Sequence, residues 1–381
     1  MSQPTILLTP GPTPVPEVTR KLMAEPIFHH RTPRYRKIFG DVSERLKKVF
    51  LTKNPVYTFA GSGSLAMEAA LVNFHSAGDK ILVVENGKFA ERFTLIAKAF
   101  GLNPISLKVP YGEAPAPRQI EEALQKDPDI KAVCVQLCET STAVLSDVKA
   151  IGEIVAKTNA LLIVDAISGL GADRLETDLW HVDLVISGSQ KALMLPPGLA
   201  FLSVSEKAKS RMATAKLPRF YYDLKYYEKS LKDSDTPWTP ALTLVIGLQK
   251  SLDLIEQEGI ENVFKRCAVN AAFTRESLQK MGLKLFSKAA SSTVTAAWLP
   301  EGIDGEKLCQ VMRDEKGIAM AGGQGDQMKG KVVRICHMGA IAKQDIEAGL
   351  KILGETLKEM KASRHTLTSR HRTNAELYQS R

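Results

Sequence analysis

The residues best suited to chemistry lie at the ends of two strand-like runs near the middle of the chain. Lys191 lies in a Gly/Ser turn, residues 187–191, that follows the apolar run 184–186, and Asp165 ends the apolar run 161–164. In sheets whose strands alternate with helices, ligands bind at the carboxyl ends of the strands. We therefore expect the Lys191 amine and the Asp165 carboxylate to face one site.

This pair of side chains has the chemistry that pyridoxal phosphate requires. The cofactor needs a lysine amine to form a Schiff base and a carboxylate that keeps its ring nitrogen protonated, so that the ring withdraws electrons. A lone lysine is usually a surface charge, and a lone aspartate after a strand is usually a helix N-cap. Because both residues occur at matching strand ends, the sequence favours the cofactor site.

A Gly-rich turn offers a place for the cofactor phosphate. The segment 60–64 (AGSGS) follows the run 56–59 and opens an expected helix at 64–74. Glycines let the backbone approach an anion, and the first turn of a helix supplies unpaired N–H groups. The turn lacks the third glycine of a dinucleotide fingerprint, where Ala66 stands instead, and it lacks the GK[ST] of a P-loop.

Short apolar runs alternate with helix-length segments over residues 50–205, which predicts an α/β fold. We expect a large domain with a mostly parallel sheet covered by helices, followed by a smaller C-terminal α+β domain. The expected strands of the large domain are 56–59, 81–84, 132–137, 161–164, 184–186 and 199–204, and its helices are 64–74, 89–100, 116–126, 147–158 and 241–258. Strands at 292–298 and 332–337 and a final helix near 344–361 are expected in the small domain.

The pattern of strands and helices predicts how the chain is divided into domains. We assign residues 1–258 to the N-terminal segment and large cofactor-binding domain, 259–361 to the small domain, and 362–381 to a basic, disordered tail.

The formal net charge is +9, and residues 361–381 hold five basic residues against one glutamate. The body is therefore only mildly basic and has no aromatic-interleaved basic motif, so we expect no nucleic-acid partner.

Composition and cysteine spacing also indicate the cellular compartment in which the protein is expected. No apolar run approaches the ~20 residues that span a bilayer, and the start of the chain does not resemble a signal peptide. The five cysteines are scattered, without CxxC spacing. This pattern is typical of a reducing compartment and argues against a metal site. We expect a cytoplasmic protein with no membrane contact and no metal.

Several motifs together resemble the class V aminotransferases of the pyridoxal-phosphate-dependent fold-type I superfamily. The likeness runs from residue 8 to about 349 and is greatest to the alanine–glyoxylate and serine–pyruvate (serine–glyoxylate) aminotransferases. The most specific motif is SGSQKALMLPPG (187–198) together with LLIVDAISGLGA (161–172). The supporting motifs are TPGPTPVP (9–16), HHRTPRY (29–35), GSGSLAMEAAL (61–71), TPWTPA (236–241) and GKVVRI (330–335).

The resemblance implies a role for each matching residue. Lys191 would carry the internal aldimine and move the proton between the substrate Cα and the cofactor, and Asp165 would pair with the ring nitrogen. The remaining cofactor contacts would be Ser62, Gly63, Ser64 and Gln190 at the phosphate, Phe89 stacked on the ring, and Thr140 near the phenolic oxygen.

The resemblance also implies where the substrate and a partner subunit would bind. Arg334 would hold the substrate carboxylate with a two-pronged hydrogen bond, and the backbone of Gly11 would lie beside it. Thr236 and Thr239 would reach the phosphate in the neighbouring subunit. A homodimer with shared active sites is therefore expected.

The implied activity is a ping-pong transamination from alanine or serine to glyoxylate or pyruvate. His29, His30 and Arg31 could instead bind an anionic side chain, which would suit a phosphoserine, aspartate or aminophosphonate donor. A further alternative is a protein of the same fold that serves as a subunit of a complex. The intact set of Lys191, Asp165 and Arg334 argues against that alternative.

Overall fold

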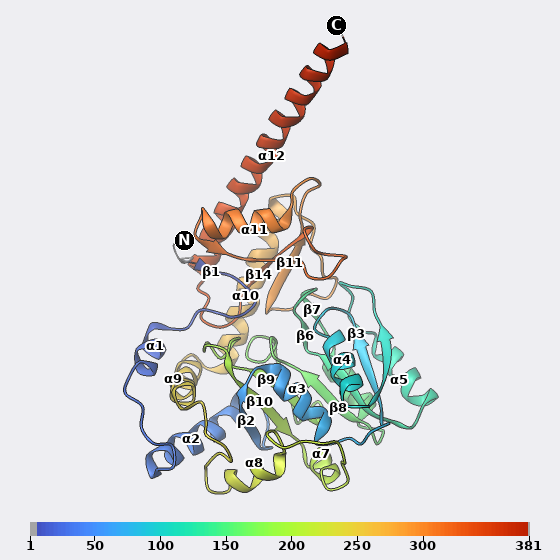
Figure 1. Ribbon diagram of the computed structural model, residues 1–381, viewed down its shortest axis with the longest axis vertical. Coiled ribbons are helices and arrows are strands. Elements are labelled where there is room, and N and C mark those ends of the chain that lie inside the picture. The colour runs from blue at the N-terminus through green and yellow to red at the C-terminus, as the bar shows by residue number, and fades with distance from the viewer. Residues whose placement is uncertain (1–5, 380–381) are drawn as a thin grey trace.

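The computed structural model describes residues 6–379, of which 363–379 are described by their helical backbone only. Its centre is a seven-stranded sheet in the order β2-β10-β9-β8-β5-β3-β4, with helices on both faces (Figure 1). Strand β10 runs antiparallel to its two neighbours, and the other pairs are parallel. The strands are β2 (Val56–Gly61), β3 (Lys80–Glu85), β4 (Asn103–Lys108), β5 (Ile130–Gln136), β8 (Leu161–Asp165), β9 (Leu184–Gly188) and β10 (Gly198–Val204). The predicted α/β architecture is confirmed.

The central strands send alternate side chains into two hydrophobic cores. In β8, Leu161 and Ile163 belong to the core that includes α3 (Gly63–Val72). The residues between them, such as Leu162, belong to the core on the other face, with α9 (Leu242–Glu258). A strand covered on both faces needs apolar residues throughout, which explains the continuous apolar runs. Asp165 is the first polar residue of its run and lies at the carboxyl end of β8.

The other helices of this region cover the sheet or flank it. They are α1 (Glu17–Met23), α2 (Pro33–Val49), α4 (Glu91–Ala99), α5 (Pro117–Lys126), α6 (Val148–Val155), α7 (Glu206–Arg211) and α8 (Leu224–Leu231). A short hairpin, β6 (Cys138–Glu139) and β7 (Val144–Leu145), follows β5. All six strands predicted here are present, with ends within two residues of the expected positions.

Strand β4, at the edge of the sheet, was not predicted. Its sequence is NPISLK, and its residues are exposed or half-buried. Asn and Pro are rare in strands, and edge strands tolerate polar residues because one side of the strand is unpaired. The sequence signal for a buried strand is therefore absent at this position.

The C-terminal part combines long helices with a three-stranded antiparallel sheet, β11-β14-β13. Its elements are α10 (Ile260–Lys280), β11 (Val294–Trp298), α11 (Gly305–Asp314), β12 (Ile318–Ala319), β13 (Ala321–Gly322) and β14 (Val332–Cys336). Gly259, with a φ of 82°, separates α9 from α10, and this backbone conformation is one that glycine adopts readily. The N-terminal strand β1 (Ile6–Leu7) pairs with β12, so the N-terminal segment also contributes to this part.

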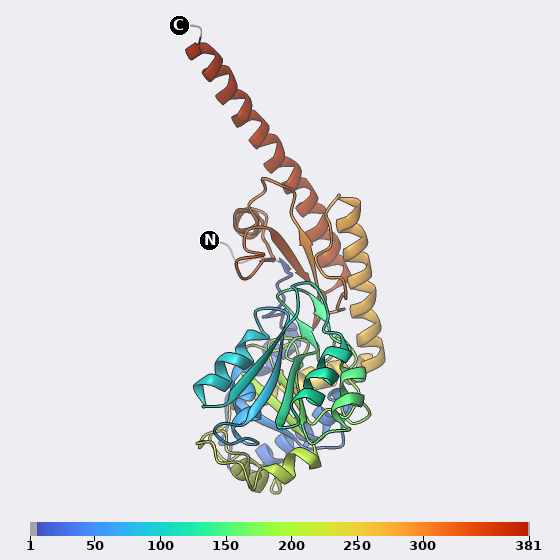
Figure 2. The same cartoon turned by 90° about the vertical axis from the view of Figure 1, so that its right-hand side faces the viewer.

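The last helix, α12 (Lys343–Gln379), continues well past residue 361, where we expected it to end. Both views show it projecting away from the body (Figures 1 and 2). The segment that we predicted to be a disordered tail is thus helical as far as Gln379, and residues 380–381 lie outside the described part. Residues 362–379 contain neither Gly nor Pro, which favours a continued helix. None of the helices within residues 6–379 has the length and hydrophobicity of a membrane span.

Candidate active site

A cavity at the carboxyl ends of β8 and β9 contains most of the residues singled out in the sequence. The predicted residues that line it are Ser62, Gly63, Ser64, Phe89, Thr140, Asp165, Gln190 and Lys191. The same cavity is lined by four residues that sequence analysis did not single out, namely Arg92, Cys138, Ile167 and Ser168. The topology therefore gathers turns that are far apart in the chain.

Lys191 is buried against the N-terminal segment. Only 9% of its surface is exposed, and its Nζ donates a hydrogen bond to the Pro10 carbonyl oxygen. Gly11 lies so close that a Cβ there would be 2.5 Å from Nζ, and its φ of 110° also favours glycine. The hydroxyl of Thr13 donates to the Lys191 carbonyl at 2.7 Å. Burial lowers the pKa of Lys191, although the charge of Asp165 opposes this effect.

Asp165 is a buried carboxylate with few partners. It is 6% exposed, and its Oδ1 accepts one hydrogen bond from the Ile167 amide at 2.9 Å. Within residues 6–379, no cation forms an ion pair with it at 4.0 Å or less. Burial raises the pKa of Asp165 to about 6. A cationic N–H placed in the cavity would find an acceptor here that lacks a charged partner.

The turn before α3 provides an anion site. Ser62 occupies the N-cap position with an extended backbone, and its side chain forms no capping hydrogen bond. Arg92 adds a positive charge, because its Nη1 donates to the Ser64 hydroxyl at 3.1 Å. The Oε1 of Gln190 is buried and has no hydrogen-bond partner among the described residues. The helix N-terminus and the guanidinium together favour a phosphate group in this corner of the cavity.

Phe89 and Thr140 enter the cavity from separate loops. The Arg92 guanidinium lies 5.3 Å from the centre of the Phe89 ring. The Thr140 hydroxyl donates to the Ser168 hydroxyl at 2.6 Å. These contacts give both predicted residues defined surroundings, with Arg92 and Ser168 as their neighbours.

Arg334, on β14, does not line the cavity but bonds to Thr140, which does. It is 3% exposed, its Nε donates to the Gly322 carbonyl at 2.9 Å, and its Nη1 donates to the Thr140 carbonyl at 3.0 Å. Its Nη2 donates no hydrogen bond within the described part of the chain. Burial lowers the pKa of Arg334 to about 10, so the guanidinium remains charged at neutral pH.

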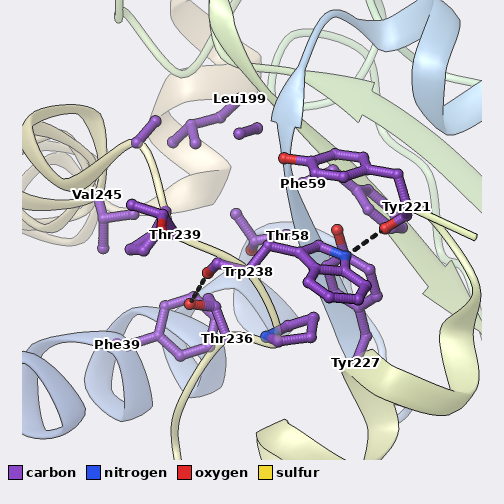
Figure 3. Close-up of a pocket in the computed structure, with 14 residues that line it drawn as sticks. Phe39, Thr58, Phe59, Leu199, Tyr221, Tyr227, Thr236, Trp238, Thr239 and Val245 are labelled. Carbon is purple, nitrogen blue, oxygen red and sulfur yellow. Dashed lines mark hydrogen bonds between the residues drawn. The ribbon is translucent and has the colours of Figure 1, made fainter. Parts of the chain in front are cut away.

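Thr236 and Thr239 are not in the Lys191 cavity of this chain. They line a second pocket with aromatic walls that include Phe59, Tyr221 and Trp238 (Figure 3). The Thr236 hydroxyl donates to the Trp238 carbonyl at 2.9 Å, and the Trp238 indole donates to the Tyr221 carbonyl at 2.6 Å. These bonds hold the segment in a fixed shape.

Arg31, which sequence analysis left as a candidate substrate contact, supports this same segment. Its Nη1 donates to Asp235 Oδ1 at 2.7 Å and to the Thr236 carbonyl at 2.6 Å. Arg36 Nε also donates to Asp235, at 3.2 Å. The charge of Arg31 is therefore already paired within the chain.

Three of the four missed lining residues, and the neighbouring Glu139, gave only weak signals in the sequence. Arg92 lies one turn after Phe89, and Ser168 lies three residues after Asp165, so proximity to predicted site residues is their only signal. Glu139 is a charged residue in an otherwise uncharged run, VCVQLCETST, which indicates a buried carboxylate with partners. Cys138 precedes it and looks like any small buried residue.

Comparison with known proteins places the chain in a family. The family model described as aminotransferase class-V matches residues 20–347. The chain is 36% identical over 346 residues to the serine–glyoxylate aminotransferase of Methylorubrum extorquens, covering 87% of this chain and 86% of that protein. It is 35% identical over 349 residues to the L-aspartate–glyoxylate aminotransferase of Paracoccus denitrificans, covering 90% and 88%. A protein of Anabaena cylindrica named soluble hydrogenase 42 kDa subunit is 39% identical over 365 residues, covering 94% and 95%.

A solved structure agrees with these sequence matches. The alanine–glyoxylate aminotransferase of a Nostoc species aligns with a TM-score of 0.90 and 27% identity, covering 94% of this chain and 96% of that one. Because the matches span nearly the whole chain, and the family model by itself spans most of it, this protein belongs to the class V aminotransferases, pyridoxal-phosphate-dependent enzymes of fold type I.

Proposed function

We propose that this enzyme transfers an amino group from a small amino acid, alanine or serine, to a small 2-oxo acid, glyoxylate or pyruvate, by a ping-pong mechanism. The observation that carries the proposal is that buried Lys191 and Asp165 line one cavity, while the buried Arg334 donates to the carbonyl of Thr140, another residue of its lining. Two relatives are named as glyoxylate aminotransferases, which supports the choice of acceptor.

The residues of the cavity fit pyridoxal phosphate. The turn 62–64 would hold the phosphate, and the side-chain NH₂ of Gln190, which lines the same cavity, could donate a hydrogen bond to it. Asp165 would accept from the ring N–H, and Phe89 would stack on the ring. When bound, the cofactor supplies an aldehyde carbon for the amino group and a ring that withdraws electrons from the substrate Cα.

The protein residues then have separate tasks. The lowered pKa of Lys191 leaves more of its amine unprotonated, and this amine would take the Cα proton and return it. Arg334 would bind the α-carboxylate, with the Gly11 backbone beside it, and so align the Cα–H bond. Thr140 supports Arg334 through its carbonyl oxygen and would place its hydroxyl near the cofactor.

The second pocket suggests how a partner subunit contributes. We propose that the chain forms a homodimer in which Thr236 and Thr239 of each copy reach the phosphate held by the other. The pocket of Figure 3 supports this, because the segment is fixed by internal bonds and lies outside its own Lys191 cavity. The five cysteines are free, which supports a reducing, cytoplasmic location.

Two alternatives differ in their support. An acidic or phosphorylated donor would need a second cation, and Arg31 is already engaged by Asp235 in this chain. The relative named L-aspartate–glyoxylate aminotransferase nevertheless favours aspartate as the second candidate. The relative named as a hydrogenase subunit makes a role within a complex the third, although the presence of Lys191 and Asp165 in one cavity supports catalysis by this chain.

The experiment is a comparison of kcat/KM for alanine, serine, aspartate and phosphoserine with glyoxylate as acceptor. The wild-type protein is compared with Arg31→Gln. We expect alanine or serine to be preferred and Arg31→Gln to affect all donors equally, since Arg31 contacts a loop and not the substrate. A tenfold or greater preference for aspartate or phosphoserine (about 1.4 kcal/mol), lost in Arg31→Gln, would overturn the proposal.

A further inference from the structure

Glu139 is a buried residue next to the Lys191 cavity. None of the roles proposed above uses its carboxylate. It has no exposed surface, and donors surround both of its oxygens. Oε1 accepts from the amides of Phe89 (3.3 Å) and Ser141 (3.0 Å) and from the Ser141 hydroxyl (2.5 Å). Oε2 accepts from the Ala90 amide at 2.8 Å. All of these partners donate, which matches an ionised carboxylate that can only accept.

These bonds join two loops that are 50 residues apart in the chain. One loop precedes α4 and carries Phe89; the other follows β6 and carries Thr140. Gly87 packs so closely on the carboxylate that a Cβ there would lie 2.4 Å from its carbons. The Ser141 hydroxyl strengthens the joint, since it also accepts from the Lys88 amide at 3.0 Å. The two loops therefore cannot shift independently.

Both loops support groups proposed to act on the cofactor or the substrate. Phe89 would stack on the ring, and the carbonyl of Thr140 holds Nη1 of Arg334. The charge of Glu139 also supports Arg334, because it raises a guanidinium pKa that burial otherwise lowers. Burial raises the pKa of Glu139 itself, and the donors listed above oppose that effect.

We propose that Glu139 is a positioning residue that fixes the Phe89 ring and the Arg334 guanidinium relative to one cofactor, an inference that rests on the functions proposed above for those two residues. Its carboxylate acts through backbone amides and a carbonyl, and it touches neither substrate nor cofactor. The specific consequence is that the charge and the length of this side chain set how the cofactor is held, beyond any effect on folding.

The test compares Glu139→Gln with the matched control Asp183→Asn. Asp183 is also buried, accepts from one backbone amide and one hydroxyl and lies 3.5 Å from the Lys207 amine, but it precedes β9, at the opposite end of the strand from Lys191. In Glu139→Gln, the new NH₂ group would face a donor, so at least one bond is lost. We expect the dissociation constant for pyridoxal phosphate to rise about tenfold and kcat to fall about tenfold. The visible circular dichroism of the bound cofactor should change, and Asp183→Asn should change none of these.

Thermal unfolding of the apoproteins separates positioning from folding. We expect Glu139→Gln and Asp183→Asn to lower Tm to a similar extent. A folded Glu139→Gln protein with wild-type cofactor affinity and circular dichroism would overturn the proposal. If Glu139→Gln fails to fold, Ser141→Ala decides, because it removes one donor to Glu139 and the acceptor of the Lys88 amide but leaves the three backbone amide bonds of the carboxylate in place. We expect a two- to threefold weaker cofactor affinity, about 0.5 kcal/mol, and no change would overturn the proposal.

Failure of the proposed function would look different. Cofactor affinity and circular dichroism are measured without any amino acid, so they test Glu139 even if the wild-type protein transaminates none of the proposed donors.

Discussion

Each end of the central strands has a buried carboxylate, and the two carboxylates differ in how many donors and cations surround them. Asp183 comes directly before β9, is 5% exposed, and accepts from the Leu162 amide at 2.9 Å and the Ser205 hydroxyl at 2.8 Å. The amine of Lys207 lies 3.5 Å from it. Asp165 ends β8, is 6% exposed, and accepts a hydrogen bond only from the Ile167 amide within the described chain.

This difference separates a structural charge from a functional one. A buried carboxylate with too few donors destabilises the fold, so such a carboxylate in a cavity indicates a ligand that supplies the missing donor or cation. Asp183 is completed by the protein, and β8, β9 and the segment after β10 are tied together as a result. Asp165 has no cationic partner within 4.0 Å in the described chain, and it lies with Lys191 at the other end of these strands, where we propose that the cofactor binds.

The largest effect should come from Lys191→Ala. Loss of the amine removes both the attachment point of the cofactor and the group that moves the Cα proton, so kcat should fall by about 10³-fold or more. Steady-state transamination measures this, and borohydride treatment with peptide mapping should label Lys191 in the wild-type protein. Undiminished activity in the variant, or a label on another lysine, would refute the assignment.

Asp165→Asn should separate activity from stability. The Asn oxygen can still accept from Ile167, but it cannot balance a cationic ring, so kcat should fall by about a hundredfold (about 2.7 kcal/mol). In the apoprotein the variant should be the more stable one at pH 7, by up to about 3 kcal/mol, because burial raises the pKa of Asp165 from 3.8 to about 6.

The raised pKa of Asp165 determines the pH range in which Asp165→Asn is more stable than the wild type. A raised carboxylate pKa means that the folded protein binds the proton more tightly, so the cost of ionisation is absent below about pH 4 and complete above about pH 6. Urea unfolding of the apoproteins should show equal stability at pH 4 and a more stable variant at pH 7. Asp183→Asn should instead be destabilised at pH 7, and a loss of stability in both variants at that pH would break the comparison.

Arg334→Lys should have an intermediate effect that does not depend on the donor. A lysine cannot keep the bonds to Gly322 and Thr140 and also fork onto a carboxylate, so KM should rise and kcat fall, with kcat/KM lower by about 10- to 100-fold. The factor should be similar for alanine, serine and aspartate, since all share the α-carboxylate. A loss confined to one donor would show that Arg334 contacts a side chain instead.

Thr239→Ala should have the smallest effect and should act across subunits. Loss of one charge-assisted hydrogen bond at the low end of the usual range, about 1.5 kcal/mol, should weaken cofactor affinity about tenfold. Thr58→Val is the matched control, because Thr58 lines the same pocket and its hydroxyl has no partner among the described residues. An active, cofactor-saturated monomer at assay concentration would contradict the shared site.

The sequence predicted which residues meet in the Lys191 cavity where local pattern determines position. The continuous apolar runs before Asp165 and Lys191 require strands buried on both faces, and the residues that end such strands share one edge of the sheet. The Gly/Ser turn before α3 is equally local. These features placed eight predicted residues in one cavity.

The remaining features depend on contacts between distant segments, which residue types do not reveal. The pairing of Arg31 with Asp235 spans 204 residues and converts a candidate substrate contact into a support of the Thr236 segment. The pairing of β1 with β12 is of the same kind. The extent of α12 is a separate case, because a basic composition does not distinguish a disordered tail from a continued helix.

We propose that Lys191, Asp165 and Arg334 together support the transfer of an amino group from a small amino acid. The most direct test is a single half-reaction: the protein loaded with pyridoxal phosphate is mixed with alanine, serine, aspartate or phosphoserine, without an acceptor. We predict that alanine or serine converts the bound cofactor to pyridoxamine phosphate and releases one equivalent of the matching 2-oxo acid. An unchanged cofactor with every amino acid, or conversion by aspartate or phosphoserine alone, would contradict the account.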